Sequence, residues 1–164
     1  YVRAEELAKR LTKKGFAIIT GGSSGVMQAA NKGAFETGGA SVGLNINLPD
    51  TQTYNPYLTE KFSFDHFFVR KVMLTYASEV YIYFPGGFGT LDEFFEIVTL
   101  VQTKKIKKIP IVLFGKEYWE PLLVFIENKL YREHGAIDED DMNLYKLVDS
   151  VDEAYDYIIA NVSC

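Results

Sequence analysis

The chain has 164 residues, of which 48% are hydrophobic, and it carries a net charge of −5 at pH 7. This length and composition suit one domain (1–164) with a substantial core. The acidic balance argues against a general nucleic-acid binder, whose surface must be basic. A single cysteine, Cys164, argues against a disulfide framework or a zinc site. No apolar run reaches the roughly 20 residues that cross a bilayer, and no secretory signal is visible. We therefore expect a cytoplasmic protein with no membrane or nucleic-acid partner.

The N-terminal third of the chain has the pattern of a β-loop-α-β unit. Apolar residues at helical spacing predict a first helix that ends near Gly15. A short buried strand (16–20), a glycine-rich turn (21–25), a helix (26–37) and a second strand (40–46) follow. Because the chain opens inside a helix, we expect the first strand of the fold to be missing from it.

Residues 47–63 break this regular pattern. Pro49, Asp50, Asn55 and Pro56 are typical of irregular structure. Long loops inside compact domains are usually functional or disordered, and three aromatic residues favour an ordered loop that covers a ligand; they are Tyr54, Tyr57 and Phe62. The next helix, predicted at 64–78, holds His66, Arg70 and Lys71.

The C-terminal half continues the alternation of strands and helices. Strands are predicted at 80–84, 109–114 and 144–148, the last at a sheet edge, and helices at 90–103, 119–130 and 152–161. The helix at 90–103 is apolar nearly all round, which favours burial against the sheet on one side and a second subunit on the other. The lysine cluster 104–108 is interpreted as a solvated helix end, and 135–141 as an exposed acidic segment.

This alternation predicts the α/β class, with a Rossmann-like three-layer α/β/α arrangement and a mostly parallel sheet. Right-handed crossovers would place the two glycine-rich loops, at 21–25 and 85–89, on the same edge of that sheet. Open parallel sheets bind their ligands at that edge.

The stretch 79–96 has the order of an anion site. A buried strand is followed by Pro85, Gly86, Gly87 and Gly89, where the backbone can approach a ligand closely. Thr90 is the expected N-cap of the next helix, and Glu93 would complete a capping box with it. Amide groups and the helix dipole would then face an anion, with Asp92 and Glu93 in the first turn.

Each of these features also has a plainer interpretation. The loop 21–25 matches neither GxGxxG nor GxxxxGK[ST], so it is a tight turn or a different phosphate loop. Arg70 is either a structural ion-pair partner or a planar fork for a phosphate or a base. Lys71 and Asp92 are favoured as surface charges, Glu93 can be a capping residue only, and His66 is more often packed than catalytic. The sequence contains no cysteine nucleophile, no Ser-His-Asp pattern and no metal-ligand cluster.

These residues carry a resemblance to a known family. The segment PGGFGTLDE, residues 85–93, resembles the PGGxGTxxE motif of the Lonely Guy (LOG) family of nucleoside 5′-monophosphate phosphoribohydrolases, often mislabelled lysine decarboxylases. Arg70 and Lys71 match the family's Arg-Lys pair, and residues 21–27 look like its first glycine loop. That loop lacks two of the family's glycines, and residues 67–69 are apolar rather than polar, which points to a broad bacterial branch.

The resemblance implies that Arg70 and Glu93 are the catalytic pair for hydrolysis of an N-glycosidic bond. It implies that Gly86, Gly87, Gly89 and Thr90 bind the 5′-phosphate, and that Gly22, Ser23, Ser24 and Gly25 line its other side. The further substrate- or phosphate-binding residues that it implies are Met27, Lys71, Pro85 and Glu96. It also implies no metal, no organic cofactor, a small nucleotide substrate of purine or cytokinin type, and a homodimer or larger homo-oligomer. A non-catalytic nucleotide or molybdenum-cofactor carrier of the same fold is the alternative. Pyridoxal-dependent decarboxylation is disfavoured, because no lysine has the required context.

Overall fold

The computed structural model describes residues 1–47 and 55–162. Residues 48–54 of the predicted ligand-covering loop, Pro49, Asp50 and Tyr54 among them, lie outside the described residues, as does Cys164. The chain divides into two compact units at residue 78. The single domain predicted from the sequence stays a prediction.

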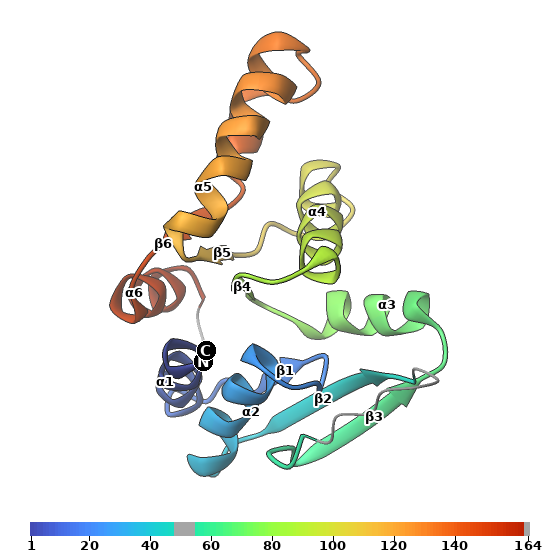
Figure 1. The fold of residues 1–164 in the computed structure, drawn as a ribbon, viewed down its shortest axis with the longest axis vertical. Coiled ribbons are helices and arrows are strands. Elements are labelled where there is room, and N and C mark those ends of the chain that lie inside the picture. Colours follow the sequence, from blue (N-terminus) through green and yellow to red (C-terminus); the bar gives the residue numbers. More distant parts are fainter. Residues whose placement is uncertain (48–54, 163–164) are drawn as a thin grey trace. The chain divides into compact units, whose positions relative to one another are not determined.

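The first unit is a three-stranded sheet with helices. Its elements in chain order are α1 (Val2–Thr12), β1 (Ile18–Thr20), α2 (Val26–Glu36), β2 (Ser41–Ile46), β3 (Glu60–Phe64) and α3 (Phe67–Ala77). The strands lie in the order β1-β2-β3, and both pairings are parallel, with Ile18 opposite Ser41 and Val42 opposite Glu60 (Figure 1). This arrangement places the turn after β1 and the end of β2 at the same edge of the sheet.

Helices α1 and α2 lie side by side at very short range (Figure 1). A β-carbon added at Gly33 of α2 would lie 2.3 Å from the backbone oxygen of Glu5 and 3.0 Å from the Ala8 side chain. Glycine is therefore needed at this position because α1 occupies the space of a side chain. Ion pairs join the same two helices, from Glu5 to Lys32 (3.1 Å) and from Lys9 to Glu36 (3.0 Å), and Glu5 also pairs with Lys9 (2.6 Å) within α1. Both ammonium groups lower the pKa of the Glu5 carboxyl.

The second unit is another parallel sheet, in the order β4-β5-β6. Its elements are β4 (Tyr81–Tyr83), α4 (Phe88–Gln102), β5 (Ile111–Phe114), α5 (Lys116–Phe125), a π-helical turn (Ile126–Glu133), a 3-10 helix (Glu139–Asn143), β6 (Lys146–Val148) and α6 (Val151–Asn161). β6 lies at the sheet edge, as predicted. The lysines at 104, 105, 107 and 108 are exposed, which agrees with a solvated helix end.

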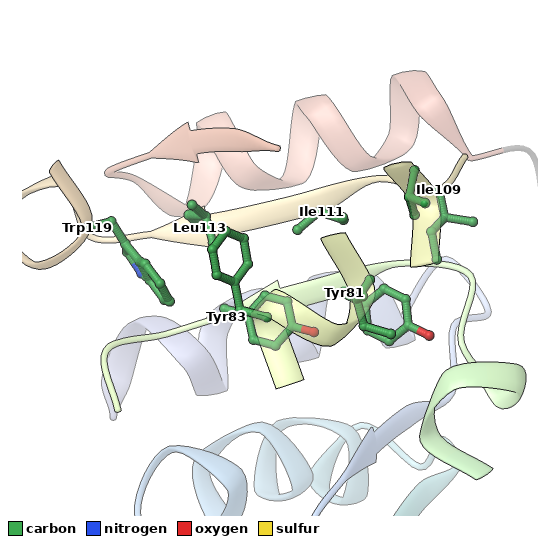
Figure 2. Close-up of a cluster of buried hydrophobic side chains, with 9 residues drawn as sticks. Tyr81, Tyr83, Ile109, Ile111, Leu113 and Trp119 are labelled. Atoms are coloured by element: carbon green, nitrogen blue, oxygen red, sulfur yellow. The ribbon is translucent and has the colours of Figure 1, made fainter. Parts of the chain in front are cut away.

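Aromatic and branched side chains fill the core of the second unit. The four residues of β5 are buried, and Tyr81 and Tyr83 of β4 stack with ring centroids 6.3 Å apart. Trp119 of α5 is fully buried and packs edge-on against Phe94 of α4, at 5.4 Å between ring centroids. Figure 2 shows Tyr83, Leu113 and Trp119 together in this cluster. The core holds α4 and α5 against the sheet, and so fixes where the loop 85–89 leaves β4.

Two predicted boundaries are wrong. The segment 47–63 was predicted to be irregular, but Glu60–Phe64 form β3 and pair with β2. This strand is exposed along most of its length, so it lacks the buried apolar run by which strands are usually recognised. As a result, Phe64 belongs to β3, and α3 begins at Phe67.

Among the described residues, no helix is long and apolar enough to cross a membrane. In the same residues, no group of three or more His, Cys, Asp or Glu side chains is arranged to hold a metal ion.

We expect Gly33→Ala to destabilise the protein by roughly 1–3 kcal/mol, because the new methyl group overpacks the α1–α2 contact. The matched control is Gly89→Ala in α4, where no described atom lies within 4 Å of an added β-carbon. That change should stabilise the helix by up to about 1 kcal/mol. Urea unfolding followed by far-UV circular dichroism measures both, and a neutral Gly33→Ala would contradict the close contact.

Candidate functional site

The first glycine loop connects β1 to α2 through two residues in the left-handed region. Gly22 has a φ of 71° and Gly25, which is the N-cap residue of α2, has a φ of 72°. A β-carbon at Gly22 would lie 1.9 Å from Oδ1 of Asn45, whereas one at Gly25 would meet no described atom within 4 Å. Gly22 is therefore required both by its backbone angle and by packing, and Gly25 by its backbone angle alone. The Asn45 amide also donates a hydrogen bond to the Gly22 carbonyl (3.3 Å).

The structure brings Arg70 of α3 to this loop. A β-carbon added at Gly21 would lie 3.6 Å from Nη2 of Arg70 and 2.9 Å from Sδ of Met27. A side chain at position 21 would therefore displace the Met27 thioether and would touch the Arg70 guanidinium group. The guanidinium carbon also lies 5.8 Å from the centre of the Phe67 ring, within the range of a cation–π interaction. Arg70 thus presents a positive charge and a planar set of donors beside a loop that is poor in side chains.

Polar residues that were not singled out as site residues hold the first glycine loop in place. The Gly22 N–H donates to Oγ1 of Thr20 (2.9 Å), and this hydroxyl donates to Oδ1 of Asn31 (2.5 Å). Asn31 lies on α2 and is completely buried. The sequence offered one signal for the role of Asn31. It is a polar residue on the inner face of a predicted helix, four residues after Met27.

The helix that follows the second glycine loop begins earlier than the sequence predicted. Gly87, in an extended conformation, is the N-cap residue of α4, and Thr90 already lies inside the helix. The predicted capping box of Thr90 and Glu93 is therefore wrong, and neither Asp92 nor Glu93 lies in the first turn. Gly86 is compatible with this earlier start, because a side chain there would meet the Thr90 hydroxyl in the first turn of α4. A capping box does occur further along the chain, between Asp138 and Asp141.

Packing fixes the second glycine loop. A β-carbon at Gly86 would lie 2.1 Å from Oγ1 of Thr90, so the Thr90 hydroxyl lies directly over Gly86. The Tyr118 hydroxyl donates a hydrogen bond to the Gly86 carbonyl (2.8 Å). No described atom would lie within 4 Å of a β-carbon at Gly87 or Gly89. The Thr90 N–H donates to the Gly87 carbonyl (3.1 Å), whereas the N–H groups of Phe88 and Gly89 precede the helical hydrogen-bond ladder and suit an anion.

Glu93 lies one turn after Thr90 on α4 and is half-buried. Its backbone carbonyl accepts a hydrogen bond from the Tyr83 hydroxyl (3.2 Å), which ties this turn of the helix to β4. Burial raises the pKa of the Tyr83 hydroxyl, and the charges of Glu93 and Glu96 raise it further. Both carboxylates therefore lie within electrostatic reach of this one buried hydroxyl.

The predicted site residues fall into two groups. Gly22, Gly25, Met27 and Arg70 lie around the first loop in the first unit, with half-buried Ser23 and Lys71 and exposed Ser24. The second unit contains the others, namely Pro85, Gly86, Gly87, Gly89, Thr90, Glu93 and Glu96. The pairing of Arg70 with Glu93 across the two groups stays a prediction.

A protein-family model described as "possible lysine decarboxylase" matches residues 27–158, most of the chain. Two similar curated proteins have names that refer to one activity. A cytokinin riboside 5′-monophosphate phosphoribohydrolase of Rhodococcoides fascians is 30% identical over 76% of this chain. A probable enzyme of the same name from Oryza sativa subsp. japonica, LOGL5, is 31% identical over 79%. The chain belongs to the LOG family. It spans 65% and 54% of the lengths of these two relatives.

Solved structures agree on the fold of this LOG-family chain. The molybdenum cofactor carrier protein from Chlamydomonas reinhardtii aligns with a TM-score of 0.72 and 24% identity, over 96% of this chain and 84% of its own. A second structure of a Moco carrier protein from the same organism has a TM-score of 0.62 and 26% identity, over 97% of this chain and 86% of its own. These likenesses confirm the predicted Rossmann-like α/β fold.

We expect Gly22→Ala to destabilise this LOG-family protein more than Gly25→Ala does. Both changes put a side chain at a left-handed position, at a cost of about 1–2 kcal/mol, but only Gly22→Ala also meets a neighbour. The clash with Asn45 should add about 1–3 kcal/mol, and Asn45→Ala should recover part of it in the double variant. Equal midpoints of urea unfolding for the two single variants would contradict this account of the loop.

Tyr83→Phe should change how stability depends on alkaline pH. The pKa of Tyr83 in the folded protein is raised above its unfolded value of about 10. Its contribution to stability is therefore complete below about pH 10 and is lost as the pH rises above it. The phenylalanine variant should lose about 1 kcal/mol at pH 8 through the missing hydrogen bond, and its stability should then fall less steeply above about pH 10. Urea unfolding at a series of pH values tests this, and parallel curves would contradict it.

Proposed function

We propose that the protein hydrolyses the N-glycosidic bond of a nucleoside 5′-monophosphate and releases a free base and ribose 5-phosphate. The observation that carries the proposal is the Arg70 guanidinium group lying against a glycine loop that is almost free of side chains. The names of the two LOG-family relatives support this reaction at about 30% identity.

In this reaction, water attacks the anomeric carbon of the ribose while the bond from that carbon to the base nitrogen breaks. The water contributes a hydroxyl group to the ribose, and the departing base takes up a proton. Positive charge develops on the sugar ring in the transition state, as it does in glycoside hydrolysis. A carboxylate beside the ring stabilises that charge and orients the water, and we assign this role to Glu93.

The remaining site residues would hold the nucleotide. The N–H groups at the start of α4, after Gly86 and Gly87, are assigned to the 5′-phosphate, together with the Thr90 hydroxyl. Arg70 is assigned to the phosphate or the base on the side of the first glycine loop, where its planar fork makes two parallel hydrogen bonds. Ser23, Ser24, Met27, Lys71, Pro85 and Glu96 are assigned to the walls of the site.

We extend the proposal to the setting of the reaction. The purine or cytokinin type of the base follows the names of the relatives, and the cytoplasm follows the composition of the chain. A homodimer or larger homo-oligomer is supported by α4, which buries Phe94, Ile97 and Val101 yet leaves Phe95 40% exposed.

A carrier that binds the nucleotide or molybdenum cofactor without turnover is the second candidate. Its support is the 26% identity to a Moco carrier protein over nearly the whole chain. The two functions differ in one observable, because a carrier returns its ligand intact and a hydrolase does not.

Glu93→Gln should lower kcat for adenosine 5′-monophosphate by about 100-fold or more, the usual contribution of a positioned general base. The matched control is Asp92→Asn, which removes the neighbouring, exposed carboxylate and should keep at least half of the activity. Release of ribose 5-phosphate from adenosine and cytokinin ribotides is the measurement. Absence of release by the wild type, or equal rates for Glu93→Gln and the wild type, would sink the proposal. Calorimetric binding with intact ligand recovered would favour the carrier.

A further inference from the structure

A continuous chain of hydrogen bonds links the first glycine loop to residues 55–57, which are distant in sequence. At one end, the Gly22 N–H donates to Thr20 Oγ1 (2.9 Å), which donates to Asn31 Oδ1 (2.5 Å). At the other end, the Tyr57 N–H donates to Asn55 Oδ1 (3.1 Å), and Asn55 Nδ2 donates to the same Asn31 oxygen (3.0 Å). The two branches meet at a single buried oxygen atom.

The backbone groups at the two ends fix the direction of every bond. A backbone N–H can only donate, so Thr20 Oγ1 must accept from Gly22 and pass its own hydrogen to Asn31. In the same way, the Tyr57 N–H requires the oxygen of the Asn55 amide to face it, which turns the Asn55 NH₂ group toward Asn31. The side chain at position 31 must accept hydrogen bonds on one side and donate them on the other. Only asparagine has an oxygen and an NH₂ group on so short a side chain.

The other half of the Asn31 amide is also used. Its Nδ2 donates to Ser41 Oγ (2.9 Å) and to the carbonyl of Val42 (3.4 Å) at the start of β2. The Ser41 hydroxyl in turn donates to the carbonyl of Tyr57 (2.6 Å). Asn31 and Ser41 are both completely buried, so water cannot replace a missing partner. The amide therefore has all four of its hydrogen-bonding positions satisfied by the protein.

We propose that Asn31 is a positioning residue that couples the first glycine loop to residues 55–57, so that a change at either end alters the stability of the other. The free energy of such a coupling is shared by both ends, which makes the effect reciprocal. Where the proposed function holds, a nucleotide at the first glycine loop would also hold residues 55–57 in place. This makes Thr20, Asn31 and Asn55 determinants of how the loop receives its ligand, although none of them needs to touch it.

The test removes one link at the loop end and reads the other end. In Thr20→Val the hydroxyl is lost with little change of shape, and we expect the Tyr57 amide to exchange with deuterium about five to ten times faster, the effect of one lost hydrogen bond. Thr20→Ser keeps the hydroxyl and should restore the exchange rate of the wild type. Thr37→Val is the matched control, since its hydroxyl donates to the Gly33 carbonyl (2.7 Å) within α2 and lies outside the chain of bonds. NMR-detected exchange measures all three.

Two results would overturn the proposal. One is an unchanged Tyr57 exchange rate in Thr20→Val, and the other is an equal acceleration in Thr37→Val, which would indicate general loss of stability. If Thr20→Val does not fold, Asn55→Ala reads the coupling in reverse. Exchange of the Gly22 amide should then accelerate by a similar factor, and an unchanged rate would overturn the proposal.

A second arm adds adenosine 5′-monophosphate as the probe. In the wild type, the nucleotide should slow exchange at Tyr57, and in Thr20→Val this slowing should fall by at least half. If the wild type binds no nucleotide, the proposed function fails, while the comparison without ligand still decides the coupling. If nucleotide binds but slows exchange at Tyr57 equally in both proteins, the coupling fails and the proposed function stands.

Discussion

The conformation of the first unit depends on the burial of one carboxamide. Asn31 makes hydrogen bonds to the side chains of Thr20 in β1, Ser41 in β2 and Asn55, and so joins three segments of the chain. Burying an amide without partners costs several kcal/mol in an apolar medium, so the arrangement is stable only when every contact forms together. A network of this kind specifies one geometry, because a partly formed version is worse than none.

The two glycine loops are held by different physical means. The first loop is held by a network of hydrogen bonds and has left-handed backbone angles at Gly22 and Gly25. The second loop is held by one hydrogen bond, from the Tyr118 hydroxyl to the Gly86 carbonyl, and by the Thr90 hydroxyl that lies over Gly86. A large aromatic core supports the second arrangement. The first loop therefore depends on several linked hydrogen bonds, and the second on one hydroxyl donor and on the space above Gly86.

Elements could be predicted from the sequence where a buried segment also has a regular pattern of residues. The apolar run of β5 and the first glycine-rich turn were predicted correctly, because each has a strong local signal. Thr90 was misassigned as a helix cap, because it fits the capping-box pattern while the helix starts two residues earlier, at Phe88. β3 was missed because an exposed strand has no apolar run. The role of Asn31 was not visible, since its partners lie 10 to 24 residues away in the chain and only the fold brings them together.

The place of Trp119 has a consequence for how the two units can be followed separately. The chain has a single tryptophan, and its indole ring is fully buried against Phe94 in the core of the second unit. Its intrinsic fluorescence therefore reports the unfolding of the second unit and not that of the first. Agreement between its melting curve and the circular dichroism of the whole chain would mean that both units unfold as one cooperative body.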